Sequence, residues 1–405
     1  MLRLFNTLGR KIRTFQPQGK ERVTVFTCGP SVYQRAHIGN YRTFLFEDIL
    51  VRYLEYAGYK VKRGLIFTDV EDKAVLEAAR KKESLKQLTD KNIREFLGEM
   101  ELLRMKIPDY LPRASESVNE AVEIIECLIE RKTAYWHKHN VYFDPLKFPD
   151  FGKLFGLDMS KWPEKKRRFH KDTYPGIQWN LGDFILWHGY KEGETVYWDT
   201  RIGRGRPSWN IQDPCMISRY FDETLSIYCG GIDNLYRHHD YTLAILESLR
   251  PYPMAKFWLH CHHLYVNGQK MSKSKGNICY TDTLCREGYS MQEIRFFLIY
   301  AHYRESLNFS KKNMEAAVKK LREFKDLVNA IEGQAASKIP RDSVISRRIK
   351  KVFSDHMDDD LHVREAFEGL YKIVSGLDIP SLKESEASGI RKALGKIDEV
   401  LQVLF

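Results

Sequence analysis

The sequence predicts an α/β protein in two parts, a doubly wound parallel sheet with an inserted subdomain and a C-terminal all-α helical bundle. Residues 21–67 read as strand, loop, helix and strand, and strand patterns return after residue 224. Beyond Asn308 the apolar residues recur only at helical spacing. We therefore expect one domain over residues 1–305, with an insertion over about 110–200, and a helical bundle over 306–405.

The first strand is expected at residues 21–28, which are rich in β-branched side chains. Gly29 and Pro30 end it, and residues 41–56 then carry apolar side chains at helical spacing. A second strand is expected at residues 60–67. This order opens a Rossmann-like sheet, in which ligands bind at the carboxyl ends of the strands.

Residues 74–135 carry long amphipathic segments and are expected to be largely helical. Residues 133–190 are mixed and rich in aromatic side chains, with a strand expected at 140–143, and they have the character of an insertion. The central sheet is expected to resume at residues 224–228 and 257–260.

The C-terminal region is expected to consist of helices at residues 311–331, 343–377 and 391–404. The polar stretch 332–340 separates the first of these from the second and reads as a linker that Pro340 ends. Such a series of amphipathic helices joined by short connections predicts a helical bundle.

The composition is that of an ordinary globular protein, with 405 residues, 43% hydrophobic and 29% charged. No run of 18 apolar residues is present, so we expect no membrane-spanning helix. The N-terminus does not read as a signal peptide, and we expect a cytoplasmic location. The seven cysteines are irregularly spaced without a CxxC pair, so most are expected to be buried thiols.

The formal net charge of +11 favours a polyanionic partner such as a nucleic acid or nucleotide phosphates. Residues 311–405 hold 18 Lys and Arg against 16 Asp and Glu, a net +2, which leaves +9 for residues 1–310. A merely basic surface is the alternative interpretation. If the chain binds a polyanion, the N-terminal three quarters are expected to contact it.

The motif His37-Ile-Gly-Asn40 lies between the first strand and the following helix. Gly39 allows a ligand close to the backbone, and a helix start offers N–H groups to phosphate. His37 and Asn40 can each donate a hydrogen bond to a phosphate oxygen. Taken alone the motif says little, because a histidine at a strand end is more often a structural residue.

A second motif, Lys270-Met-Ser-Lys-Ser274, is followed by Lys275-Gly-Asn277. Two lysines on a short loop can neutralise a pyrophosphate leaving group, whose charge grows in the transition state. A solvated basic loop is the alternative for this motif by itself.

Together the two motifs resemble the paired ATP signatures of class I aminoacyl-tRNA synthetases, with Asn40 where the family usually has a histidine. Further segments narrow the resemblance to cysteinyl-tRNA synthetases, among them Cys28-Gly-Pro-Ser-Val-Tyr33 and Thr68-Asp-Val-Glu-Asp-Lys73. The other matching segments are residues 41–44, 141–143, 151–154, 183–187, 203–207, 230–233, 238–239, 301–304, 307–309 and 358–361. The resemblance spans roughly 90% of the chain, and the helical bundle is part of it.

The resemblance implies attack of an amino-acid carboxylate on the α-phosphate of ATP, with Mg²⁺ accompanying the nucleotide. It implies catalytic roles for His37, Asn40, Lys270 and Lys273. The ATP site would contain His37, Gly39, Asn40, Gly230, Gly231, Asp233, Lys270, Met271, Ser272, Lys273 and Ser274.

The resemblance also implies a zinc ion that selects cysteine, since a soft thiolate prefers zinc far more than a hydroxyl does. Cys28 and His238 occupy two of the four ligand positions. The third position holds Asp213, with Cys215 two residues on, and the fourth holds Thr242. The expected metal ligands are thus Cys28, His238 and either Asp213 or Cys215. Because only two of the four ligand positions match, the sequence leaves open whether the protein binds zinc.

Tyr228 stands where the family has an active-site histidine, so the expected amino-acid pocket is also altered. Its residues would be Cys28, Thr68, Tyr228, His238 and Thr242. The substitutions at 213, 228 and 242 lead to the hypothesis that the pocket accepts something other than cysteine.

Three functions follow from the sequence. The first is activation of an amino acid and its transfer to tRNA, as in a cysteine–tRNA ligase. The second is transfer to a small-molecule amine, because the 131 residues after Ser274 are enough for a bundle but for little of an anticodon-binding domain. The third is a binding paralogue without catalysis, against which the intact His37, Lys270 and Lys273 argue.

Overall fold

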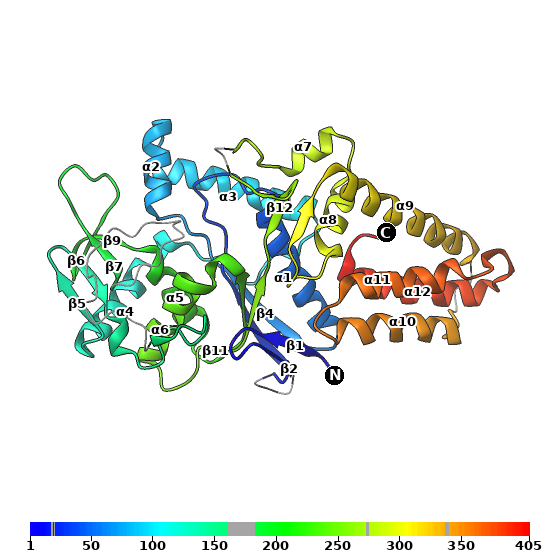
Figure 1. Ribbon diagram of the computed structural model, residues 1–405, viewed down its shortest axis with the longest axis horizontal. Helices are drawn as coiled ribbons and strands as arrows, with labels where there is room; N and C mark the ends of the chain where they lie inside the picture. The colour runs from blue at the N-terminus through cyan, green and yellow to red at the C-terminus, as the bar shows by residue number, and fades with distance from the viewer. Residues whose placement is uncertain (18, 20, 160–182, 273–274, 337–339) are drawn as a thin grey trace.

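The computed structural model describes residues 1–405 apart from 18, 20, 160–182, 273–274 and 337–339. A four-stranded sheet lies at its centre, with the insertion on one side and the helical bundle on the other (Figure 1). The expected fold class, a Rossmann-like sheet with an antiparallel insertion and a C-terminal helical region, is confirmed. No described helix is long and apolar enough to cross a bilayer.

The central sheet has the strand order β11-β10-β3-β4, and all three pairs are parallel. Its strands are β3 (Arg22–Thr27), β4 (Lys60–Leu65), β10 (Leu225–Gly231) and β11 (Ala255–Cys261). Every residue of β3 after Arg22 is buried, which agrees with the unbroken β-branched run of its sequence. Parallel strands covered on both faces require such runs.

Helices cover both faces of the sheet. Helix α1 (Ile38–Tyr56), which joins β3 to β4, lies in one hydrophobic core together with the bundle helices. Helix α6 (Asp240–Leu249), which joins β10 to β11, lies in a second core with α4 (Val118–Glu130) and α5 (Trp209–Tyr220). Each crossover connection therefore returns the chain to the same edge of the sheet, where ligand sites form.

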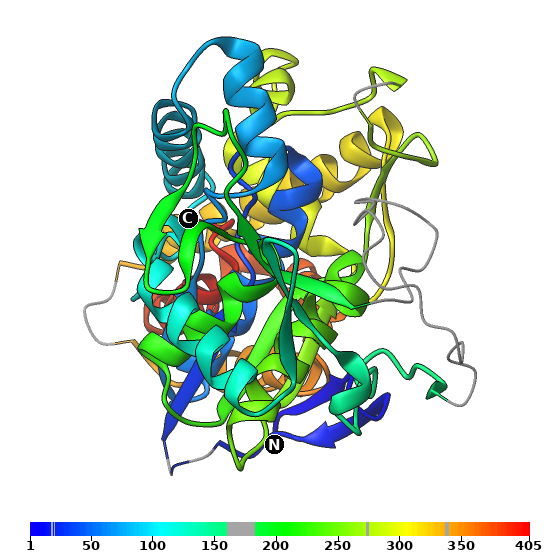
Figure 2. The same ribbon diagram turned by 90° about the vertical axis from the view of Figure 1, so that its left-hand side faces the viewer.

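The insertion is a five-stranded antiparallel sheet in the order β5-β6-β7-β9-β8. Its strands are β5 (Ala134–His137), β6 (Asn140–Phe143), β7 (Phe184–Gly189), β8 (Trp198–Thr200) and β9 (Gly203–Pro207). Strand β6 coincides with the predicted strand at 140–143. Helices α2 (Asp72–Lys81) and α3 (Leu85–Leu102) precede the insertion and lie with α7 (Thr281–Arg286) along one side of the molecule, at the top of the views (Figures 1 and 2).

Two smaller sheets complete the described strands. A hairpin at the N-terminus pairs β1 (Arg3–Asn6) with β2 (Lys11–Thr14). After β11 the chain forms β12 (Leu264–Val266), β13 (Gln269–Lys270) and, beyond helix α8 (Met291–Tyr300), β14 (Leu307–Phe309). Strand β12 pairs with both β13 and β14, so the second motif begins on a small sheet.

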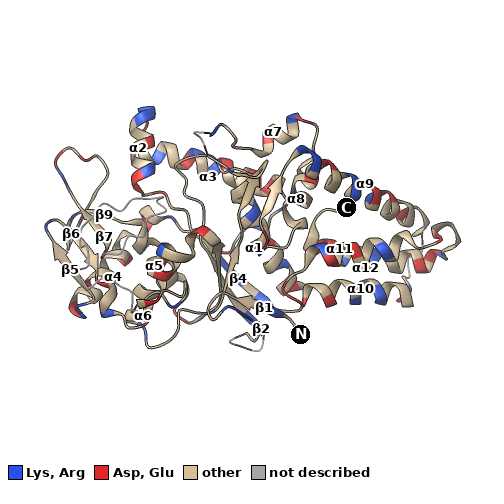
Figure 3. Ribbon diagram, viewed as in Figure 1, with Lys and Arg blue, Asp and Glu red and all other residues tan. Residues whose placement is uncertain are grey.

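The bundle consists of α9 (Lys311–Gln334), α10 (Val344–Met357), α11 (Val363–Ser375) and α12 (Glu384–Leu401). Lys and Arg are intermixed with Asp and Glu over the bundle (Figure 3), in agreement with the small net charge of residues 311–405. Spaced pairs such as Lys351 with Asp355, 2.6 Å apart, join successive turns of one helix.

The expected helical stretch 343–377 is wrong in its centre, because residues 358–362 turn the chain between α10 and α11. Asp360 adopts a φ of 58°, and its buried carboxylate accepts hydrogen bonds from Tyr303, Arg304 and the Phe5 backbone N–H. Partners more than 50 residues away thus fix this turn, which helical periodicity does not reveal. The last helix begins at Glu384 and ends at Leu401, where residues 391–404 were expected.

Arg295 on α8 attaches the bundle to the domain that holds the central sheet. Its fully buried guanidinium lies 2.6 Å from the Asp48 carboxylate on α1. It also donates to the carbonyl oxygens of Leu103, at the end of α3, and Leu401, at the end of α12. One side chain therefore joins three helices that are far apart in sequence.

Candidate active site

A cavity of 520 Å³ opens at the carboxyl ends of the four central strands. Segments that follow β3, β4, β10 and β11 all contribute to its wall. Gly29 shows how closely these segments approach, since a Cβ at this position would lie 1.5 Å from the Ile66 carbonyl oxygen. The cavity therefore occupies the place where a sheet of this topology binds its ligands.

His37 and Asn40 begin helix α1 with a reciprocal cap. The Asn40 N–H donates to His37 Nδ1 at 3.3 Å, and the His37 N–H donates to Asn40 Oδ1 at 3.0 Å. Because Nδ1 accepts a hydrogen bond, the ring proton lies on Nε2. Burial lowers the pKa of His37, so the neutral ring persists at neutral pH. The cap thus leaves His37 Nε2 and Asn40 Nδ2 as donors at the cavity wall.

The two motifs meet at this wall. Lys270 and Met271 line the cavity together with His37, Gly39 and Asn40. A Cβ on Gly39 would lie 2.5 Å from Met271 Cε, the end of a flexible side chain, and 3.0 Å from His37 Cε1, so the two motifs are in close contact here. Segments 233 residues apart in sequence therefore share one surface. Lys273 and Ser274 lie outside the described residues.

Asn277 shapes the second motif, a role that the sequence analysis did not assign. Its Oδ1 accepts the Ser272 N–H at 2.9 Å, and its Nδ2 donates to the Lys270 carbonyl at 3.2 Å. The amide side chain thereby spans the loop from one end to the other. Its position three residues after the motif was the only feature of the sequence that could have indicated this role.

Glu99 on α3 was also missed, because it lies far in sequence from both motifs. Its carboxylate accepts hydrogen bonds from Arg35, ahead of His37, and from Tyr41 on α1. It also accepts one from the Thr281 hydroxyl at 2.9 Å, at the start of α7. A second link runs from the Ile38 N–H to the Cys279 carbonyl at 3.1 Å. Glu99 therefore connects the surroundings of both motifs.

Gly231 and Asp233 lie on the cavity wall after β10, as the ATP-site expectation required. A Cβ on Gly231 would lie 2.6 Å from Asp233 Oδ1, so the glycine makes room for this carboxylate. Gly230 lies behind the wall, where a Cβ would lie 2.5 Å from His239 Cε1. It thus makes room for a histidine rather than for a nucleotide.

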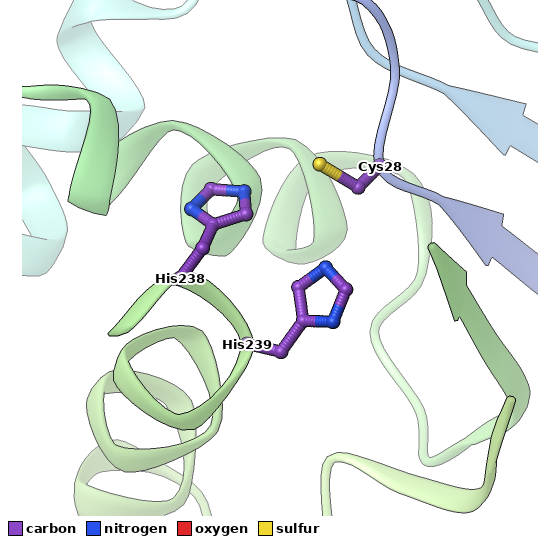
Figure 4. Close-up of side chains that lie close together, drawn as sticks. All are labelled: Cys28, His238 and His239. Atoms are coloured by element: carbon purple, nitrogen blue, oxygen red, sulfur yellow. The ribbon is translucent and has the colours of Figure 1, made fainter. Parts of the chain in front are cut away.

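Cys28 and His238 line the far end of the cavity. With His239 they form a buried cluster whose ligand atoms lie within 4.8 Å of one another (Figure 4). The Trp209 ring stacks on His238 with 4.3 Å between centroids. Burial raises the pKa of the Cys28 thiol, and the negative charge of the Asp213 carboxylate raises it further. Sulfur and imidazole nitrogen are donors that zinc prefers.

The structure separates the two candidates for the third ligand. Asp213 on α5 lies 3.2 Å from His238 Nε2, and its Oδ2 accepts a hydrogen bond from the Tyr228 hydroxyl. Cys215 instead donates to the Gln212 carbonyl at 3.0 Å. Asp213 therefore lies beside the cluster through its contact with His238, whereas Cys215 packs in the second hydrophobic core.

Of the residues expected in the amino-acid pocket, Thr68 lines the cavity with Cys28 and His238. Tyr228 and Thr242 are fully buried behind the wall. The Thr242 hydroxyl donates to the His238 carbonyl at 2.8 Å, a bond from the first turn of α6 to the turn before it. Tyr228 and Thr242 therefore do not form the surface of the cavity. They lie behind Cys28 and His238, which do.

The residues of the cluster fit a metal ion. Three of their buried atoms have no hydrogen-bond partner among the described residues, namely Asp213 Oδ1, His238 Nδ1 and His239 Nε2. Such atoms cost free energy unless a cation or water satisfies them. The cluster combines one sulfur and two imidazoles, with the Asp213 carboxylate beside His238, and sulfur and nitrogen donors of this kind suit zinc.

A parallel sheet with both motifs on one cavity at its carboxyl edge defines a class I aminoacyl-tRNA synthetase. The family model described as tRNA synthetases class I (C) catalytic domain matches residues 14–319. The cysteine–tRNA ligase of Chlamydia pneumoniae is 35% identical over 413 residues, which cover 100% of this chain and 86% of that protein. The cysteine–tRNA ligase of Solibacter usitatus is likewise 35% identical, with 100% and 87% covered.

Solved structures show the same fold at low sequence identity. Methionyl-tRNA synthetase of Mycobacterium tuberculosis, in complex with methionyl-adenylate, has a TM-score of 0.66 at 13% identity, with 95% of this chain and 90% of that one covered. The leucyl enzyme of Agrobacterium radiobacter K84 has a TM-score of 0.69 at 11% identity, with 96% and 85% covered. The chain belongs to the cysteinyl-tRNA synthetase family, and it is a ligase of class I. Enzymes of this class use ATP, an amino acid and tRNA.

Proposed function

We propose that the protein activates cysteine with ATP and transfers it to tRNA, as a cysteine–tRNA ligase. The observation that carries the proposal is that one cavity joins both ATP motifs to a thiol- and imidazole-bearing cluster at its far end. The 35% identity to named cysteine–tRNA ligases over the whole chain supports it.

The activation step is an in-line attack of the amino-acid carboxylate on the α-phosphate, with pyrophosphate as the leaving group. Neutral His37 donates Nε2–H to a phosphate oxygen, and Asn40 donates through Nδ2. Lys270 and Lys273 neutralise the charge that grows on pyrophosphate. Gly231 and Asp233 face the nucleoside, and Mg²⁺ accompanies ATP. The residues position the reactants and stabilise charge, and none forms a covalent bond with the substrate.

Cys28 and His238 are the residues that would hold a zinc ion in the amino-acid pocket. When bound, such an ion supplies a soft Lewis acid that prefers a thiolate to a hydroxyl. Cys28 and His238 fix the position of this end of the pocket, and Thr68 forms part of the wall near it. Trp209 stacks on His238 and holds the imidazole in place.

The acceptor in the second step is tRNA. Residues 1–310 carry a net +9, which suits a polyanion. Transfer to a small amine is the alternative acceptor, and it shares the activation step. The test therefore measures the two steps separately.

The first measurement is ATP–pyrophosphate exchange with each standard amino acid in turn, and the second is transfer to total tRNA. Cysteine alone should support exchange, and cysteinyl-tRNA should form. Exchange without transfer would favour the small-amine acceptor, whereas no exchange with any amino acid would favour a binding paralogue. Exchange that depends on another amino acid would mean that the altered pocket has changed specificity.

Lys270→Ala tests the leaving-group role within the same assay. The exchange rate should fall at least tenfold, which corresponds to about 1.4 kcal/mol of transition-state stabilisation. Lys275→Ala is the matched control, because Lys275 is exposed on the same loop and does not line the cavity. Equal rates in the two variants would contradict the role of Lys270.

A further inference from the structure

The side of the active-site cavity that borders the insertion carries a group of polar side chains. Tyr33, Glu71 and Lys73 line it from the segments that follow β3 and β4. His188 on β7 and Arg206 on β9 line it from the insertion. These five residues form an insertion-side wall of the cavity. None of them belongs to the two ATP motifs or to the expected amino-acid pocket, so the activation step leaves their chemistry unused.

Glu71 has a fixed place in this wall. The Thr68 N–H donates to the Pro30 carbonyl at 3.2 Å, and this bond pairs the segments that leave the ends of β3 and β4. Helix α2 begins directly after Glu71, at Asp72. Arg206 donates to the Asp72 carboxylate and so attaches the insertion to the start of that helix. Glu71 therefore lies where two strand ends and the insertion meet.

The Glu71 side chain does not cap the helix that it precedes. A residue at the N-cap position usually accepts a hydrogen bond from an N–H of the first turn, but Glu71 makes no such bond. Its Oε1 is buried and has no hydrogen-bond partner among the residues that the structure describes. A buried acceptor of this kind costs free energy until a ligand supplies a donor. The cavity is the place from which a ligand can reach Glu71.

The charges around Glu71 suit a base. Burial raises its pKa, the Lys73 ammonium lowers it and the Asp72 carboxylate raises it, with a result of about 7. Burial, and next the Glu71 carboxylate, raise the pKa of Tyr33, so the Tyr33 hydroxyl stays protonated. A base works best when its pKa lies near the working pH. Glu71 can therefore accept a proton at neutral pH.

His188 is a competing base on the same wall. Burial, and next the Arg206 guanidinium, lower its pKa to about 4, so its ring is neutral at pH 7 but holds a proton only weakly. Asp72 is paired with Arg206. The Lys73 ammonium lies 5.4 Å from the centroid of the Tyr33 ring, a contact that favours its charged form. Glu71 is thus the better base of this group.

We propose that Glu71 is the general base of the transfer step, and that it takes the proton of the attacking ribose hydroxyl at the 3′ end of tRNA. The hydroxyl oxygen forms a bond to the carbonyl carbon of the aminoacyl-adenylate, and the bond from that carbon to the phosphate oxygen breaks. The electron pair of the broken bond leaves with AMP, and the proton passes to Glu71 and then to water. Lys73 and Arg206 supply positive charge beside the incoming phosphates. The inference rests on the proposed function, because it names the residue that serves its second step.

The test separates transfer from activation. The full-length protein forms its adenylate from cysteine and ATP, the free substrates are removed, and the transfer to added tRNA is followed by rapid quench. Glu71→Gln keeps the size of the side chain but cannot accept a proton. Its transfer rate should fall at least about 100-fold, the usual contribution of a general base, while pyrophosphate exchange stays within about twofold of the wild type.

Glu83→Gln is the matched control. Glu83 is exposed just beyond the end of α2 and does not line the cavity. The same change from a carboxylate to an amide at this position should leave both exchange and transfer at the wild-type rates.

The pH dependence of transfer in the wild type is a second measurement, and it needs no variant. The rate should rise about tenfold per pH unit below pH 7 and level off above it, because only the carboxylate form of Glu71 accepts a proton. A transfer rate that is constant from about pH 5 to about pH 8 would instead assign the base to a group such as His188, and it would overturn the proposal.

Transfer at the wild-type rate in Glu71→Gln would also overturn the proposal. An equal loss of exchange and transfer in that variant would do the same, because it would show that Glu71 binds the amino acid or ATP. Neither result would touch the proposed function. A wild type that activates cysteine but transfers none to tRNA would overturn the proposed function, and this inference with it.

Discussion

Replacing Glu99 with glutamine tests whether this side chain couples the two ATP motifs. The carboxylate is 7% exposed and accepts hydrogen bonds from Arg35, Tyr41 and Thr281. Glutamine keeps the shape but removes the charge, and its amide nitrogen cannot accept the bond that Tyr41 or Arg35 donates. A hydrogen bond to a charged group contributes about 1.5–3 kcal/mol. The Arg35 side chain is 32% exposed and keeps its contact with Asp282 at 3.0 Å, so water and that contact reduce the loss.

We therefore expect Glu99→Gln to lower the free energy of unfolding by about 1.5–3 kcal/mol. Because Glu99 contacts the segments that carry both motifs, kcat for pyrophosphate exchange should fall about tenfold, equivalent to about 1.4 kcal/mol. Urea denaturation and exchange kinetics with varied ATP measure the two effects.

Glu101→Gln is the matched control, because Glu101 is exposed two residues further along α3. It should leave both the stability and kcat unchanged. If Glu99→Gln were as stable and active as Glu101→Gln, the coupling role of Glu99 would be refuted. A loss of stability with unchanged kcat would mean that Glu99 stabilises the fold but does not couple the two motifs.

Two further predictions concern protonation and the bundle. The rate of exchange should stay constant from pH 6.5 upward and fall only below that pH. Burial lowers the pKa of His37, and protonation of its Nδ1 would break the hydrogen bond that Nδ1 accepts from the Asn40 N–H. A pH–rate profile checks this, and a rate that falls as the pH rises through 6.5 would show that the protonated ring is the active form. Arg295→Met should lower the free energy of unfolding by roughly 3 kcal/mol, because Asp48 stays buried with one partner fewer. Denaturant titration measures it, and a change below about 0.5 kcal/mol would contradict the role of Arg295 in attaching the bundle.

Much of the fold follows from the sequence because its strands lie in fully covered parallel positions. Such strands favour runs of β-branched or apolar residues, and residues 23–27 and 225–229 are buried throughout and largely of this kind. The turn at 358–362 could not be found in this way. Hydrogen bonds from Phe5, Tyr303 and Arg304 hold Asp360 in its conformation. A local sequence pattern does not indicate such distant partners.

The candidate site divides along the same line. His37 and Lys270 lie in short contiguous motifs that are specific to few protein families, so the sequence predicted them. The structure brings both residues to one cavity. Glu99 lies in an ordinary amphipathic helix, and only the packing of α3 against α1 and α7 shows what it contacts. The sequence also left Asp213 and Cys215 open as ligands. A helix turns by about 100° per residue, so positions two apart face different ways, and only the folded structure shows that Asp213 is the one that contacts His238.

The selectivity of pyrophosphate exchange for cysteine over serine shows whether the protein is a cysteine-specific ligase. The two amino acids differ only in a thiol and a hydroxyl, so the ratio of kcat/KM reports whether the Cys28 and His238 end of the cavity recognises sulfur. We expect a preference for cysteine of at least about 100-fold, since a soft metal site favours a thiolate strongly. Equal exchange with serine, or exchange that cysteine does not support, would contradict it.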